Sequence, residues 1–168
     1  MQSLRERVWG YSKIEWISFA MVGLCFLTFL FPGCNRWRKQ SKAKEALTNV
    51  KIIFDAQQKY FAAQLKENPQ FATYLSLPMT PSSPTSDSQL AAFDQEPWSK
   101  LELNIDRDVL YSYEVLAHEI GPKAYFEVYA RGDIDGDGHF SIYKVRGAID
   151  PNGKPIGSDI IYKMDPLE

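Results

Sequence analysis

The chain has few of the residues that most catalytic sites need. Its 168 residues include only two histidines, His118 and His139. No serine or cysteine has a base at a useful spacing, and no Gly-rich phosphate loop follows a strand pattern. The His118-Glu119 pair lacks the second histidine of a zinc-protease helix. We therefore predict that the protein is not an enzyme and that His118 is an exposed residue at the end of a strand.

Cysteine is equally scarce, and the two cysteines exclude a disulfide in the C-terminal part of the chain. Cys25 and Cys34 would lie about 13 Å apart along a continuous helix that rises about 1.5 Å per residue. A bridge between them would break that helix. The segment Phe31-Pro32-Gly33-Cys34 loosely resembles a lipoprotein cleavage box. Lipidation of Cys34 is therefore a competing interpretation, which the proline beside the cut fits poorly.

Neither sign of charge dominates, because 19 basic and 21 acidic residues give a net charge of -2. The distribution is uneven: residues 1–66 carry 11 basic and 4 acidic residues, and residues 67–168 carry 8 and 17. A basic first part and an acidic second part suggest electrostatic complementarity between stacked copies, and argue against a nucleic-acid site in the second part. A solvated helix beside an acidic loop region explains the same numbers equally well.

One long apolar run is present, from Trp16 to Phe31, interrupted only by Ser18, Gly23 and Thr28. A membrane-spanning helix needs about 20 residues, so this run is at the short end. An apolar surface on all sides is excessive for a buried helix in so small a chain, and we predict a transmembrane helix. Basic residues are more numerous after the run than before it, which by itself places the C-terminal side in the cytoplasm.

The residues around the start of this run form a specific pattern. Gly10 is followed by the aromatic Tyr11, Glu15 stands four residues after that aromatic, and Pro32 directly follows the apolar run. This pattern resembles the N-terminus of type IV pilins and pseudopilins, and residues 41–61 are similar to the helix of deltaproteobacterial pilins. The resemblance implies that prepilin peptidase cuts after Gly10 and that Tyr11 becomes the methylated N-terminus. It also implies insertion with the leader in the cytoplasm, opposite to the count of basic residues.

Glu15 is the residue to which the resemblance gives the clearest role. A carboxylate at the edge of an apolar span is unfavourable unless it is neutralised. In the family the corresponding glutamate meets the amine of a neighbouring subunit, which Tyr11 would supply here. The alternative is a glutamate that reaches the head groups and pairs with Lys13 or Ser12. Lys13 departs from the family pattern, which has an apolar residue there, and this departure suits a minor subunit.

The pattern as a whole divides the chain into four parts. These are a leader at 1–10, a transmembrane and assembly helix at 11–34, the amphipathic half of a spine helix at 35–67, and a globular head at 68–168. Pro32 and Gly33 are expected to break or bend the helix. An apolar stripe continues it as Ala43, Leu47, Val50, Phe54, Phe61 and Leu65. Asn68-Pro69 then ends it.

Strand patterns dominate the head. Alternation of apolar and polar residues predicts strands at 109–116, 125–130 and 140–145, with an edge strand at 160–162. Residues 78–88 are expected to form a surface loop, and Trp98 to anchor the return to the core. The predicted fold class is α+β, with a long N-terminal α-helical spine, transmembrane in its first half, packed on a small antiparallel β-sheet head in a pilin-like arrangement.

The segment from Asp133 to Ser141 carries acidic residues at alternate positions followed by glycine, as in the first half of an EF-hand loop. It predicts a calcium site formed by Asp133, Asp135, Asp137, the carbonyl of His139, and Ser141 through water. Lys144 stands where a bidentate glutamate is required, so a complete EF-hand is not expected. The alternative is an Asp-Gly turn whose carboxylates cap backbone donors. Pseudopilins use calcium in their C-terminal region, which favours the site by resemblance only.

The function implied by the resemblance is a structural subunit, of the minor kind, in a type IV pilus or a type II secretion pseudopilus. Its expected partners are other pilin subunits, prepilin peptidase, the inner-membrane assembly platform and membrane lipid, with no nucleic acid. The expected location is the inner membrane, with one span and a periplasmic head, followed by a cell-surface filament. The alternative function is a single-pass membrane protein that never polymerises and has a calcium-binding periplasmic sensor head.

Overall fold

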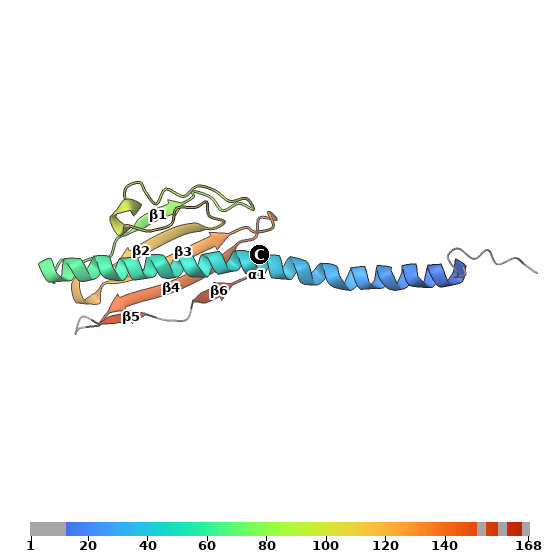
Figure 1. Cartoon of the computed structure of the whole chain (residues 1–168). Helices are drawn as coiled ribbons and strands as arrows, with labels where there is room; N and C mark the ends of the chain where they lie inside the picture. The colour runs from blue at the N-terminus through green and yellow to red at the C-terminus, as the bar shows by residue number, and fades with distance from the viewer. Residues whose placement is uncertain (1–12, 151–153, 158–160, 166–168) are drawn as a thin grey trace, which may run out of the picture. The chain divides into compact units, whose positions relative to one another are not determined.

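The computed structural model describes residues 13–150, 154–157 and 161–165, with the side chains of residues 13, 14, 26–38 and 155 left out. The processing pair, Gly10 and Tyr11, lies outside the described residues. The chain divides into two compact units, Met1–Arg38 and Lys39–Glu168. Each unit is described by itself below, with the elements labelled as in Figure 1.

Helix α1 runs from Lys13 to Glu67, so both units contain part of it. Its C-terminal end agrees with the prediction from Asn68-Pro69, because the residue before a proline disfavours helical backbone. The prediction was that Pro32 and Gly33 break or bend the helix. The backbone remains helical through both residues, so the helix does not break there.

The prediction of a membrane-spanning spine is also wrong. None of the helices over the described residues combines the length and the apolarity that a membrane crossing requires. The apolar run from Trp16 to Phe31 is shorter than the span of about 20 residues that a bilayer needs, and charged residues flank both of its ends. This finding corrects two predictions. One is the fold class with a long spine that is transmembrane in its first half, and the other is the inner-membrane location with a periplasmic head.

The second unit contains a six-stranded antiparallel sheet. In chain order its elements are β1 (Leu77–Thr80), the short 3-10 helix η1 (Trp98–Leu101), β2 (Ser112–His118), the 3-10 helix η2 (Gly121–Lys123), β3 (Tyr125–Gly132), β4 (Ser141–Ile149), β5 (Pro155–Gly157) and β6 (Tyr162–Met164). The strand order is β1-β2-β3-β4-β5, and β6 pairs with a different part of β4. The structure places β2, β3, β4 and β6 close to the predicted ranges, and β1 and β5 were missed.

The part of α1 that belongs to the second unit crosses one face of this sheet (Figure 1). Residues at spacings of three and four turn toward the strands and are buried: Ala43, Ala46, Val50, Ile53, Gln57 and Phe61. The predicted stripe is therefore rotated slightly, since Leu47, Phe54 and Leu65 lie at its border and are only partly buried. Trp98 is 2% exposed and donates its indole N–H to the carbonyl of Pro78 at 2.9 Å, which confirms it as an anchor.

Polar side chains of α1 make specific contacts inside this interface. The amide of Gln57 donates to the carbonyl of Leu75 at 2.7 Å and accepts the Leu75 N–H at 3.0 Å. Asn49 donates to the hydroxyl of Tyr113 at 2.9 Å, and Glu45 accepts the Leu110 N–H at 2.8 Å. Because each of these groups has a partner, the helix is held against the strands in one register.

The opposite face of the sheet carries a network of charges and tyrosine rings. Glu127 on β3 accepts from Lys144 at 2.8 Å and from the Tyr129 hydroxyl at 2.9 Å. Arg146 lies 3.8 Å above the ring of Tyr125. This face is therefore held by ion pairs and cation–π contacts, and α1 covers only the other face.

His118 is the last residue of β2, as the sequence predicts. Its side chain is 38% exposed, its ring stacks on Tyr125 with the centroids 4.6 Å apart, and its Nε2 lies 4.0 Å from Glu127. His118 is therefore a structural part of this outer network.

Candidate metal cluster and apolar helix segment

Three aspartates come together in the loop between β3 and β4. Asp133, Asp135 and Asp137 each offer a carboxylate oxygen, and these oxygens lie within 4.8 Å of one another. A calcium ion binds oxygen at about 2.3–2.6 Å, so ligands on opposite sides of the ion are about 5 Å apart. The three aspartates could therefore hold a metal ion.

Asp133 organises the loop. It is 8% exposed, and its two carboxylate oxygens accept the N–H groups of Gly136 at 2.8 Å and Gly138 at 3.3 Å. Both glycines have positive φ angles, +77° and +86°, which other residues adopt only with strain. These contacts match the predicted capping role for the carboxylates, and they also turn the loop so that Asp135 and Asp137 approach Asp133.

The other two predicted ligand residues, His139 and Ser141, make different contacts. His139 is exposed, and its N–H donates to Asp137 Oδ1 at 2.8 Å. Ser141 is fully buried as the first residue of β4, and its hydroxyl donates to the carbonyl of Gly132 at 3.3 Å. The Ser141 hydroxyl is therefore engaged by the strand pairing between β3 and β4.

Lys39 on α1 also contacts this loop, and the sequence did not predict this contact. Its ammonium group donates to Asp135 Oδ2 at 2.8 Å across a separation of 96 residues. The hydrogen bond from Lys39 holds the pKa of the Asp135 carboxyl below its ordinary value. A metal ion that uses Asp135 would have to compete with this ammonium group. No local sequence pattern identifies Lys39, since the contact depends on where the helix meets the loop.

No family model, curated protein or solved structure matches this chain. The prediction that the protein is not an enzyme remains a prediction.

The first unit presents a second candidate site, an apolar segment of α1. Residues 15–25 are all exposed, and the segment begins with Glu15 in the first helical turn. Six large apolar side chains in it are between 51% and 64% exposed: Trp16, Ile17, Phe19, Met21, Val22 and Leu24. They face all sides of the helix, because their spacing does not follow a single 3.6-residue stripe.

The remaining assembly residue, Pro32, lies within α1, and nothing is described of its side chain. Of the residues that the resemblance links to processing and assembly, Glu15 alone has a described side-chain environment. That environment is exposed and at the first turn of the apolar segment.

Proposed function

We propose that the protein is a structural subunit of a pilin-like filament and polymerises through its N-terminal helix. The observation that supports this proposal is the exposed apolar segment at residues 15–25. A contiguous apolar surface of this kind marks a site of association. The pattern of Gly10, Tyr11, Glu15 and Pro32 selects a pilin-like subunit among associating proteins, and it makes prepilin peptidase and other copies of the chain the proposed partners.

The energetics favour assembly in which each segment meets several neighbours. Complete burial of a fully exposed large apolar side chain contributes about 1.5–3 kcal/mol. The six side chains are between 51% and 64% exposed, so burying the rest of their surface contributes about 5–10 kcal/mol in total. Association into a complex costs about 4–15 kcal/mol in lost motion and ordering. A single neighbour would cover only one side of the helix and gain a fraction of the total. Neighbours on several sides are therefore required, as they are in a filament.

Glu15 supplies the specificity that apolar contacts lack. Apolar burial is not directional, and it permits copies to slide along one another. A carboxylate at one end of the segment removes this freedom, because it is stable inside an assembly only opposite a cation. The resemblance implies that this cation is the amine of Tyr11 in another copy.

Sedimentation velocity of the chain cleaved after Gly10, in which Tyr11 carries a free amine, tests this function. We expect the wild-type protein to form large assemblies and Met21→Ser or Leu24→Ser to shift the distribution toward single chains. Leu90→Ser is the matched control, because Leu90 is 80% exposed but belongs to the head. A wild-type chain that stays monomeric at high concentration would contradict the proposal, and so would equal effects of the helix and control substitutions.

We further propose that the metal taken by the aspartate loop is Ca²⁺. Carboxylate oxygens suit this hard cation, which accepts irregular coordination, whereas Mg²⁺ demands closer and more regular coordination. Titration calorimetry of the full chain with CaCl₂ tests this, with MgCl₂ as the comparison. We expect binding at millimolar Ca²⁺ that Asp137→Asn abolishes and that Asp94→Asn, an exposed aspartate elsewhere in the head, retains. Absence of heat for the wild-type protein would exclude the site.

A further inference from the structure

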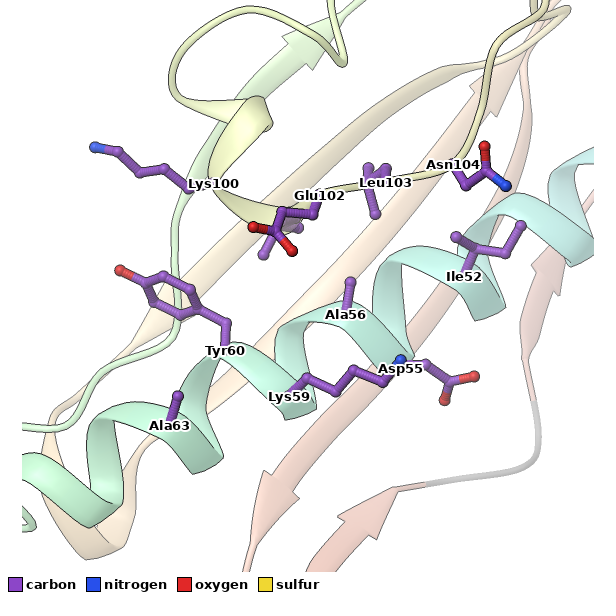
Figure 2. A pocket seen from close by; sticks show the side chains of 11 residues that line it. Ile52, Asp55, Ala56, Lys59, Tyr60, Ala63, Lys100, Glu102, Leu103 and Asn104 are labelled. Carbon is purple, nitrogen blue, oxygen red and sulfur yellow. The ribbon is translucent and has the colours of Figure 1, made fainter.

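A groove lies in the second unit between α1 and the segment that follows η1 (Figure 2). Its volume is about 540 Å³, within the range of natural binding sites. The helix contributes Ile52, Ala56, Tyr60 and Ala63, which recur at spacings of three and four and so form one side of α1. Leu103 faces them from the other wall.

The wall opposite the helix is fixed by its own backbone. Trp98 is buried at the start of η1, and Glu102 at its end has a left-handed conformation with φ 50° and ψ 46°. The Glu102 N–H donates to the carbonyl of Ser99 at 3.1 Å, which closes this turn. Non-glycine residues adopt such a conformation only when their surroundings enforce it, and they concentrate at binding sites. The turn at Glu102 therefore fixes the course of this wall.

The groove carries no net charge, and its lining combines apolar side chains with charged ones and Asn104. Its rims carry Asp55 and Lys59 on the helix and Lys100 and Glu102 on the opposite wall, so that their formal charges cancel. All four are exposed, and none of the described lining residues has a polar side chain that is nine-tenths buried. A small ion or a sugar would find no desolvated polar partner at the base. Small side chains at Ala56 and Ala63 leave room for larger apolar ones.

We infer that this groove receives the apolar row formed by Ile17, Met21 and Cys25 on α1 of a second copy. This inference rests on the proposed function and specifies which surface of the head takes part in it. The row carries no charge, which matches the neutral groove, and Ile17 and Met21 are 61% and 64% exposed. It is about 12 Å long, and the helical wall from Ile52 to Ala63 extends about 17 Å. Side chains spaced by four form a ridge of the kind that packs into a groove beside a helix.

The exposed Cys25 allows a direct test by disulfide crosslinking of the chain cleaved after Gly10. Both test proteins carry Cys34→Ser to remove the other thiol. One carries Ala63→Cys in the groove, and the matched control carries Ala62→Cys, an adjacent exposed alanine outside it. Under mild oxidation we expect at least about tenfold more Cys25-linked dimer for Ala63→Cys, since thiols held together in a complex have millimolar effective concentrations. Peptide mass spectrometry identifies the linked residues.

Four outcomes contradict the inference, and sedimentation of the same samples separates it from the proposed function. Equal crosslinking of the two variants, or a disulfide formed within one chain, overturns the groove as the receiving surface. Absence of any crosslink in a sample that nonetheless assembles does the same and leaves the filament proposal standing. A sample that does not assemble at all overturns both.

Discussion

At the scale of single residues, Glu45 is the carboxylate that α1 places closest to the core of the head. It is half-buried, accepts the Leu110 N–H at 2.8 Å and lies 3.5 Å from the Tyr113 hydroxyl. Burial raises the pKa of the Glu45 carboxyl above 4.5, against the opposing effects of the Leu110 hydrogen bond and the nearby Arg107. The folded protein therefore holds this proton more tightly than the unfolded chain does.

This pKa shift predicts a specific pH dependence of stability. As pH rises above the unfolded value of 4.5 and through the raised pKa of the folded state, ionisation of Glu45 lowers the free energy of unfolding. Glu45→Gln keeps an oxygen for the Leu110 N–H but does not titrate, so its stability should fall less over this range. Urea unfolding midpoints of both proteins from about pH 4 to 7 measure the difference. If the unfolding midpoints of both proteins change equally with pH, burial does not raise the pKa of Glu45 as described.

Gly147 on β4 illustrates how closely the helix and the sheet approach each other. A methyl group on this residue would lie 2.5 Å from ring carbons of both Phe54 and Phe126. Gly147→Ala should therefore lower the free energy of unfolding by about 1–3 kcal/mol, through overpacking. Gly23→Ala is the control, since nothing lies within 4 Å of the added methyl there. Chemical denaturation measures both, and an unchanged midpoint for Gly147→Ala would refute this view of the packing.

At the scale of elements, Lys39 joins the start of the helical part of the second unit to the loop between β3 and β4. Its ammonium group contacts Asp135, one of the three carboxylates that would hold calcium. Because one cation excludes another from the same oxygen, Lys39→Met should raise the affinity for Ca²⁺ by roughly two- to threefold, the modest effect expected when a solvent-screened ion pair is removed. Calorimetry of the full chain measures the change, with exposed Lys51→Met as the control. An equal or lower affinity in Lys39→Met would show that the ammonium does not compete.

The elements also show which parts of the fold local sequence can specify. Strand β3 was predicted because its alternating pattern spans the strand, and the end of α1 was predicted because Pro69 imposes it locally. Strands β1 and β5 were missed because Pro78 and Pro155 weaken a strand pattern, and pairing with β2 and β4 overrides that preference.

In the candidate site, too, local features could be predicted from the sequence and long-range contacts could not. The aspartate triad is a local motif and was visible in the sequence, whereas the Lys39 contact joins residues 96 positions apart. The groove beside α1 could not be predicted either, because it depends on the left-handed turn at Glu102. The membrane-spanning spine was predicted from the apolar character of residues 16–31 and failed because length and continuity of apolar residues are both required.

At the scale of the whole molecule, the chain combines an exposed apolar helix segment in one unit with a closely packed head in the other. The head has its own core and ordered polar contacts, so association through the segment does not require the head to unfold. The proposed filament therefore depends on two properties of α1 before residue 26, the apolar side chains that drive association and the carboxylate that sets the position of each copy.

The distribution of assembly mass for Glu15→Ala tests this account most directly. Glu67→Ala is the control, because Glu67 is an exposed acid at the other end of α1. Loss of one partner from a desolvated charge pair costs about 2–5 kcal/mol, which is at least a tenfold loss of affinity. We predict that sedimentation of the chains cleaved after Gly10 shows large assemblies for the wild type and Glu67→Ala, and mainly single chains or small oligomers for Glu15→Ala. Equal mass distributions for all three proteins would contradict it.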